Sequence, residues 1–290
     1  MNTKLISIPT PDGLVLNGFV FGPNRPRRVY IFIHGLGGSL FSRSDLTTIL
    51  PNKRSAVLVF NNRGYGMVNY VATAIKKKKN KRLYGWVHEV FKECVYDLDG
   101  AISYAKSLGA KEIILVGHST GCQKSVYYLA QRPRSAVKGA VLLAPMSDYS
   151  DIKVSKIDRK KYRRALTLSR ALVKAGKKHE LLPFGVWEKM IDAQRFLSLF
   201  TPDSTEEIFG YASGRKPTIL NKARKPLLVV LAEEDEFRDR PTNEIAGWFS
   251  ATLKKQRAEI KIISGAKHFF SPQAPLVRDL IAEWAEKIKK

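Results

Sequence analysis

One segment near the middle of the chain constrains the fold more than any other, the G-x-S-x-G sequence at residues 117–121. A continuous apolar run, Ile113–Val116, comes directly before the motif. An amphipathic run, Gly121–Gln131, begins at the last residue of the motif. A serine between a buried strand and a helix lies on a sharp turn that lifts its hydroxyl clear of the sheet. The helix N-terminus beneath the turn favours developing negative charge. This context predicts that Ser119 is a nucleophile, and an ordinary serine in a tight turn is the alternative.

Apolar runs and longer amphipathic runs alternate along most of the chain, which is typical of an α/β sheet covered by helices. Leu5–Ile8 and Leu14–Phe21 flank a turn with Pro and Gly, and they predict an antiparallel hairpin. Unbroken apolar runs suit parallel strands buried on both faces. These runs are Val29–Ile33, Ala56–Phe60, Ile113–Val116, Val137–Leu143, Leu227–Leu231 and Ile260–Ile263. Apolar residues at helical spacing predict helices over Trp86–Leu108, Gly121–Gln131, Thr242–Lys255 and Ala274–Lys290.

The alternation stops between about residues 147 and 225. Helical patterns occupy Lys160–Ala175 and Trp187–Phe200, and prolines interrupt the remainder. The stretch is too long for a loop inside a compact domain. We therefore expect a core of residues 1–146 and 226–290 and an inserted helical lid of residues 147–225.

A nucleophilic serine needs a base and a carboxylate that orients the base. After a turn of this kind, the acid precedes the histidine in the chain. His268 is the late one among five histidines and lies just past the last predicted strand, so we expect it to be the base. The acid should follow the preceding strand, where Asp235 is favoured over Glu233 and Glu234. Asp239 is a weaker candidate, and a loop of acids is also an ordinary solvated turn.

A glycine-rich turn, HGLGGS at residues 34–39, follows an early predicted strand, and its backbone can approach a substrate closely. The backbone N–H groups of Leu36 and of Thr120, the residue after the predicted nucleophile, would form an oxyanion hole. His34, Gly35 and His118 are expected to bind the substrate. The turn lacks G-x-x-x-x-G-K-[ST] and G-x-G-x-x-G, which disfavours a nucleotide site.

Together these residues make the chain resemble the serine α/β-hydrolases over nearly its whole length. The resemblance implies a mostly parallel eight-stranded sheet with helices on both faces, a lid inserted after the sixth strand, a Ser-His-Asp triad and no cofactor. Residues 61–66, NNRGYG, resemble the family's loop after the fourth strand, where Asp usually stands in place of Asn. The sequence GHSTG followed by Gln123 is similar to fungal siderophore-ester hydrolases, and feruloyl and cinnamoyl esterases share the His-Gly turn.

We accordingly expect a carboxylic-ester hydrolase that cleaves a small-molecule ester through an acyl-enzyme. The same residues serve lysophospholipases, monoacylglycerol-type lipases, thioesterases, peptidases and carbon–carbon bond hydrolases, which the pattern does not separate. Serine rather than aspartate at the turn disfavours a haloalkane dehalogenase.

The chain is strongly basic, since 50 Lys and Arg against 26 Asp and Glu give a net charge of +24. The densest stretches are Lys76–Arg82 and Arg159–Arg164. We interpret them mainly as solvated surface. Weak association with anionic lipid or nucleic acid is a further expectation. A non-catalytic, nucleic-acid-associated protein on the same fold is the distant alternative.

The two cysteines, Cys94 and Cys122, form neither a C-x-x-C motif nor a Cys/His cluster, so we expect no disulfide framework and no metal site. The N-terminus lacks the basic-then-apolar run of a secretory signal. No apolar stretch approaches the ~18 residues of a membrane span. These features predict a cytoplasmic protein, and they leave its oligomeric state open.

Overall fold

The computed structural model describes residues 2–73, 83–150, 152 and 158–288. Its central sheet has the strand order β1-β2-β4-β3-β8-β9-β10-β11, with the short β6 paired to β2. The β1/β2 and β2/β4 pairs are antiparallel, and the other neighbours along this path are parallel. The strands are β1 (Asn2–Pro9), β2 (Leu14–Gly22), β3 (Arg28–Ile33), β4 (Ser55–Phe60), β6 (Ala72–Thr73), β8 (Glu112–His118), β9 (Val137–Leu143), β10 (Leu227–Ala232) and β11 (Ala258–Ile263), while β5 (Asn69–Tyr70) and β7 (Leu83–Tyr84) form a separate pair.

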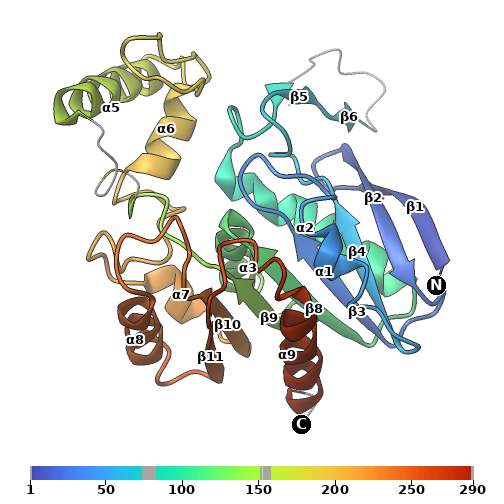
Figure 1. Ribbon diagram of the computed structural model, residues 1–290. Helices are drawn as coiled ribbons and strands as arrows, with labels where there is room; N and C mark the ends of the chain where they lie inside the picture. The colour runs from blue at the N-terminus through green and yellow to red at the C-terminus, as the bar shows by residue number, and fades with distance from the viewer. Residues whose placement is uncertain (1, 74–82, 151, 153–157, 289–290) are drawn as a thin grey trace.

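Helices cover both faces of this sheet (Figure 1). One apolar core joins the sheet to α2, α3, α7 and α8, and a second core joins it to α1 and α9. The helices are α1 (Ser44–Thr47), α2 (Cys94–Ser107), α3 (Thr120–Gln131), α5 (Arg159–Lys174), α6 (Ala193–Phe200), α7 (Thr218–Lys222), α8 (Thr242–Thr252) and α9 (Ala274–Lys287), and a 3₁₀ turn, η1 (Phe91–Glu93), precedes α2. The mostly parallel sheet between two helical layers confirms the predicted fold class.

Strand β3 illustrates why continuous apolar runs mark the centre of the sheet. Val29, Ile31 and Ile33 belong to one core, whereas Tyr30 and Phe32 belong to the core on the opposite face. Successive side chains of a strand point to opposite faces, so a strand covered on both sides needs apolar residues at every position. The carboxyl ends of the central parallel strands therefore meet at one edge, which is where an α/β sheet places its site.

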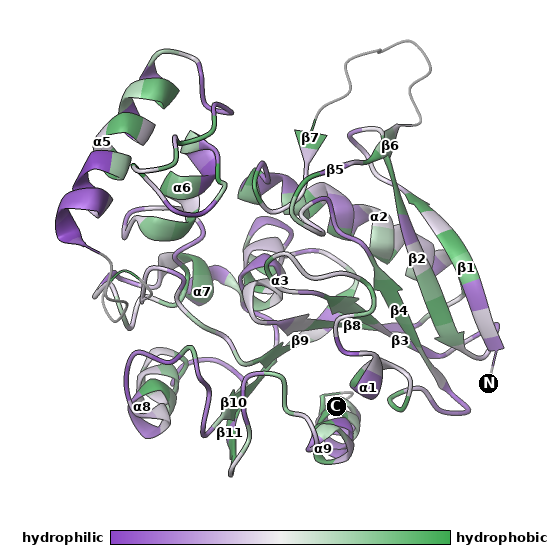
Figure 2. Cartoon of the chain, turned by 45° about the horizontal axis from the view of Figure 1, so that its top comes forward, coloured by the Kyte–Doolittle hydropathy of each residue, from purple (hydrophilic) through white to green (hydrophobic). Residues whose placement is uncertain are grey.

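Helices α5 and α6 lie together to one side of the sheet (Figure 1), in the segment between β9 and β10. They share an apolar core of their own, which includes Ala165, Trp187 and Phe196. Hydrophilic and hydrophobic residues alternate along the surface of α5 (Figure 2), as expected of a helix with one packed stripe.

The helix predicted over Trp86–Leu108 is wrong in its first part, because α2 begins only at Cys94. The His88 N–H donates to the Gly85 carbonyl at 3.1 Å, so the chain turns here instead of continuing a helix. The turn lets Glu89 reach buried basic side chains, as described below for the site.

The helix predicted over Trp187–Phe200 is likewise shorter, since α6 begins at Ala193. The Asp192 side chain accepts a hydrogen bond from the Arg195 N–H and caps the helix at that point. The preceding residues turn and place Trp187 in the core beneath the helix.

The predicted basic stretch Lys76–Arg82 lies outside the described residues. Arg159–Arg164 forms the first part of α5, and its arginine and lysine side chains are exposed. Among the described residues, no helix combines the length and apolar character that crossing a bilayer requires.

Candidate active site

Ser119 lies at the turn between β8 and α3 with a φ of 54° and a ψ of −126°. The turn is crowded by backbone on both sides. A Cβ at Gly121 would lie 2.1 Å from the Ile33 carbonyl oxygen, and one at Gly117 would lie 2.4 Å from the Gly121 carbonyl oxygen. Gly35 approaches from the next loop, where a Cβ would lie 2.8 Å from the Ser119 Cβ. Glycine is therefore required at each of these positions.

His268 and Asp235 meet at the ends of the neighbouring strands β11 and β10. The His268 Nδ1 and the Asp235 Oδ2 are 2.8 Å apart, and the imidazole is buried. Two of the other acids considered, Glu233 and Asp239, have different partners. Glu233 accepts hydrogen bonds from Ser264 and the Gly265 N–H. Of these carboxylates, Asp235 is the one that contacts the histidine ring.

Asp239 pairs with the neighbouring Arg240 side chain at 2.8 Å. Glu236 accepts a hydrogen bond from the His268 backbone N–H at 2.9 Å. The Glu236 carboxylate thus holds the backbone of the histidine loop, while Asp235 holds the ring.

Ser119 and His268 line the same pocket, which has a volume of about 350 Å³. The serine hydroxyl does not bond to the imidazole in this conformation, because the Ser119 Oγ donates to the Met146 Sδ at 3.7 Å. Catalytic hydrogen bonds are often long before substrate binds.

The backbone N–H groups of Leu36 and Thr120 donate no hydrogen bond to any residue that the structure describes. Thr120 is the first residue of α3, where the N–H has no partner within the helix. Leu36 lies on the pocket wall beside Ser119. Both donors are thus free to bind an oxygen atom of a substrate.

His34, expected at the substrate site, is the first residue of the glycine-rich turn and does not line the pocket. Its Nδ1–H donates to the Gly35 carbonyl at 2.9 Å, and its Nε2 accepts from the Asn62 N–H at 3.2 Å. Burial, reinforced by the nearby Lys124 ammonium, lowers the pKa of His34 to about 4. The neutral ring therefore joins two loops, and it is Gly35 that contacts the pocket.

His118, also expected to bind the substrate, does line the pocket, and its ring bonds to the backbone of His268. Its Nε2 lies 3.0 Å from the His268 carbonyl oxygen and donates to it, while the two ring centroids are 4.9 Å apart. Burial, together with the nearby His268, holds the pKa of His118 well below its usual range. A neutral His118 adds no charge beside the second ring.

Several pocket residues had no signal in the sequence, because they come from loops whose course depends on the whole fold. They are Ser42, Met146, Asp148, Lys189, Phe237 and Phe269. Lys189 belongs to the segment between α5 and α6, so that segment contributes directly to the pocket wall. Phe237 and Phe269 pack edge-on against His268, with ring centroids 4.8 and 5.4 Å away.

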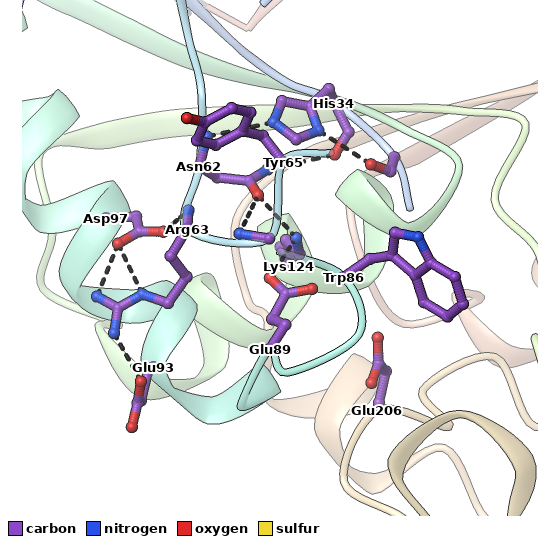
Figure 3. Close-up of polar contacts among 12 residues, drawn as sticks. His34, Asn62, Arg63, Tyr65, Trp86, Glu89, Glu93, Asp97, Lys124 and Glu206 are labelled. Carbon is purple, nitrogen blue, oxygen red and sulfur yellow. Dashed lines mark hydrogen bonds and ion pairs between the residues drawn. The ribbon is translucent and has the colours of Figure 1, made fainter. Parts of the chain in front are cut away.

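A buried charge network beneath the site was also missed (Figure 3). The Lys124 ammonium, on α3, lies 2.6 Å from Glu89 and 3.2 Å from the Asn62 side-chain oxygen. Glu89 also pairs with Arg195 of α6 at 3.2 Å, and Arg195 forms a further ion pair with Glu206. Burial alone would raise the pKa of Glu89, but Lys124 and Arg195 hold it below its usual value. The network links the helix behind the nucleophile to α6.

None of the pocket residues belongs to a cluster with metal-ligand geometry. Within the part of the chain that the structure describes, the one such group consists of His88, His179 and Asp192, outside the pocket.

Comparison with known proteins gives a family and a fold. The model of a family described as "Protein of unknown function (DUF1749)" matches residues 24–285. A Mycoplasma pneumoniae protein named "Putative esterase/lipase 2" is 26% identical over 281 residues, covering 94% of each chain. Among solved structures, the alpha/beta hydrolase GrgF from Penicillium sp. sh18 has a TM-score of 0.66 at 18% identity, covering 99% of both chains. Est1E from Butyrivibrio proteoclasticus, solved with ferulic acid, has a TM-score of 0.61 at 19% identity, covering 98% of this chain and 100% of that one. The chain therefore has the α/β-hydrolase fold.

Proposed function

Because the chain belongs to the DUF1749 family, whose description names no activity, and has the α/β-hydrolase fold, we propose from its site that it is a serine hydrolase of carboxylic esters. One observation carries the proposal. Ser119 lies on a strained turn at a helix N-terminus and shares a pocket with the His268 imidazole. The Nδ1 of this imidazole is hydrogen-bonded to the Asp235 carboxylate. This combination supplies a nucleophile, a base and a group that orients the base.

In the proposed acylation, the Ser119 Oγ attacks the ester carbonyl carbon while the His268 Nε2 takes the hydroxyl proton. The carbonyl electron pair moves onto the oxygen, which accepts hydrogen bonds from the Leu36 and Thr120 N–H groups. Asp235 keeps the proton of His268 on Nδ1 and stabilises the imidazolium. The intermediate collapses, the bond between carbon and alkoxide oxygen breaks, and His268 returns its proton to the departing alcohol.

Deacylation repeats these steps with water as the nucleophile. His268 takes a proton from the water, whose oxygen attacks the acyl carbon, and the bond to the Ser119 Oγ then breaks. The proton returns to Ser119, and the carboxylic acid leaves. No residue other than those already named has to transfer a proton.

The pocket supports a small ester as the substrate. A volume of about 350 Å³ is near the lower end of ligand sites. Phe237 and Phe269 offer an apolar wall, whereas Asp148 and Lys189 place charged groups on it. The names of the Mycoplasma relatives, which describe an esterase/lipase, support the ester rather than another acyl group. Within the expected lid of residues 147–225, we propose that the part with α5 and α6, which has its own core, covers this pocket through Lys189, whereas α7 packs in the core of the sheet.

The first experiment measures the hydrolysis of p-nitrophenyl esters, from acetate to decanoate, by the wild type and by Ser119→Ala. We expect the variant to lose at least about 10³-fold in kcat/KM. Ser107→Ala is the matched control, because Ser107 is exposed at the end of α2 and its hydroxyl donates to the Tyr104 carbonyl of the same helix. A fluorophosphonate should add covalently to the wild type and to the control but not to Ser119→Ala.

Equal turnover by the wild type and Ser119→Ala would refute the proposed nucleophile. Covalent labelling of Ser119 without turnover of any ester would retain the nucleophile and refute the ester. The hydrolysis of thioesters, peptides and carbon–carbon substrates by the wild type and by Ser119→Ala would then be measured.

A further inference from the structure

A group of imidazole and carboxylate side chains gathers away from the active-site pocket, although its members are far apart in the sequence. His88 comes from the turn before η1, and His179 and Asp192 come from the segment between α5 and α6. The Asp192 Oδ2 lies 3.1 Å from the His88 Nδ1 and 2.8 Å from the His179 Nδ1. The three ligand atoms all lie within 4.8 Å of one another.

The backbone holds these side chains in place independently of their own contacts. The Asp192 N–H donates to the Val87 carbonyl at 3.2 Å, which ties its segment to that of His88. Two further backbone bonds, from Ala193 to Glu180 at 2.9 Å and from Gln194 to Lys178 at 3.0 Å, tie the start of α6 to the loop of His179. The ligand-bearing segments therefore converge by the fold itself.

The Asp192 carboxylate is held through one of its oxygens, and the other oxygen remains available to a metal ion. The Asp192 Oδ1 accepts the Arg195 N–H at 2.7 Å, as the cap of α6. Oδ2 is the atom that faces the two rings. A hydrogen bond to the second oxygen is the kind of support that fixes a metal-ligating carboxylate.

We propose that His88, His179 and Asp192 bind one zinc ion, through the two Nδ1 atoms and Oδ2. Two imidazole nitrogens with one carboxylate oxygen suit zinc and disfavour calcium or magnesium, which prefer oxygen ligands. Zinc bonds of about 2.0–2.1 Å at tetrahedral angles put neighbouring ligand atoms about 3.3 Å apart. The two distances to the Asp192 Oδ2, 3.1 and 2.8 Å, would lengthen by a few tenths of an ångström. The ring nitrogens of His88 and His179, which lie within 4.8 Å of each other, would have to take up the same spacing as the ion binds.

Water completes the tetrahedron from the side of His179. The Asp192 side chain is fully buried and that of His88 is 8% exposed, whereas that of His179 is 36% exposed. One open side favours four-coordinate zinc over an octahedral ion, which would need room for further ligands. On binding, each ring carries its proton on Nε2 instead of donating it from Nδ1 to Asp192.

The ion would be structural and would cross-link the α5–α6 segment to the segment of His88. None of its ligands lines the pocket. The residue after His88 is Glu89, which already binds Arg195 of α6, so the zinc would reinforce an existing contact between the same two segments. This role does not depend on the proposed hydrolase activity.

The test titrates zinc chloride into the metal-free full chain, without a polyhistidine tag, by calorimetry. We expect one zinc ion per chain, with binding weakened at least about tenfold in Asp192→Asn and in His179→Asn. Asparagine is as good a helix cap as aspartate, so α6 should keep its start in the first variant. His179 is partly exposed, so the second variant carries the test if the first fails to fold.

Two controls separate this site from other places where zinc could bind. Asp158→Asn removes the carboxylate that caps α5 and should bind zinc like the wild type. His268→Asn should do the same, because the active-site imidazole is not a ligand. Zinc should also raise the melting temperature of the wild type and of these controls but not that of Asp192→Asn.

Three results would overturn the proposal: no zinc uptake by the wild type, unchanged affinity in Asp192→Asn and His179→Asn, or loss of binding in His268→Asn. The first would leave a purely hydrogen-bonded cluster in which both Nδ1–H groups donate to Asp192. The last would assign the ion to the active-site pocket.

Discussion

Replacing Ser119 with glycine should stabilise the protein while it removes the proposed activity. The backbone of Ser119, with a φ of 54° and a ψ of −126°, lies outside the regions that residues with a Cβ adopt freely. Glycine occupies this conformation readily, since it has no Cβ. The wild-type serine therefore carries a conformational cost that serves to present its hydroxyl.

The size of the effect follows from two opposing contributions. A strained backbone of this kind costs about 1–3 kcal/mol. Glycine gives the unfolded chain extra freedom, which lowers stability by about 0.4–1 kcal/mol. Among the described residues, the hydroxyl has one hydrogen bond, to the Met146 sulfur at 3.7 Å, so its loss removes little. We expect a net gain of about 1 kcal/mol in the free energy of unfolding.

Ser119→Ala is the matched control, because it removes the same hydroxyl but keeps the Cβ and hence the strain. Urea unfolding, followed by circular dichroism, would give the midpoint and slope for the wild type and both variants. The glycine variant should have the highest midpoint with an unchanged slope, and both variants should lack esterase activity. A glycine variant no more stable than the alanine variant would refute the assignment of strain to this residue.

Further predictions concern the packing of the turn and one buried acid. Gly121→Ala should destabilise the protein by about 1–3 kcal/mol or more, because its Cβ would lie 2.1 Å from the Ile33 carbonyl oxygen; urea unfolding would measure this, and wild-type stability would contradict it. Burial raises the pKa of Glu207 to about 7, although hydrogen bonds from Ser147 lower it. Between about pH 4.5 and 7 the folded protein therefore holds a proton that the unfolded chain has lost, so the wild type should lose stability as the pH rises through this range. Glu207→Gln should therefore match the wild type near pH 4 and exceed it at pH 8 by up to about 3 kcal/mol, at 1.36 kcal/mol per pKa unit; a difference independent of pH would show that this carboxyl does not titrate as stated.

The sheet could be predicted because its signals are local. Strand β3 is apolar from Val29 to Ile33 because both of its faces are covered, and five consecutive residues carry that signal. The turn at Ser119 could be predicted because G-x-S-x-G is a short motif, although the backbone that requires Gly121 to be glycine is that of Ile33, on another strand. His268 and Asp235 followed from chain order, and the structure brings their side chains to 2.8 Å.

The buried charges could not be predicted, because periodicity treats a buried position as an apolar one. Lys124 lies on a buried part of α3, and burying its ammonium is costly unless an acid pairs with it. That partner, Glu89, falls in a segment whose apolar spacing predicted a helix. The need to pair Glu89 with two cations was stronger than the local helical pattern, and the chain turns there instead.

The same network bears on how substrate reaches Ser119. Separating α6 from the core would withdraw Arg195 from Glu89 and leave a buried carboxylate with less compensation. Breaking a buried ion pair costs about 3–5 kcal/mol. Opening of the whole α5–α6 segment is thus expected to be rare, and zinc at His88 would make it rarer. Phe237 and Phe269, 43% and 49% exposed, line the pocket without belonging to the network, so we expect substrate to enter past these rings.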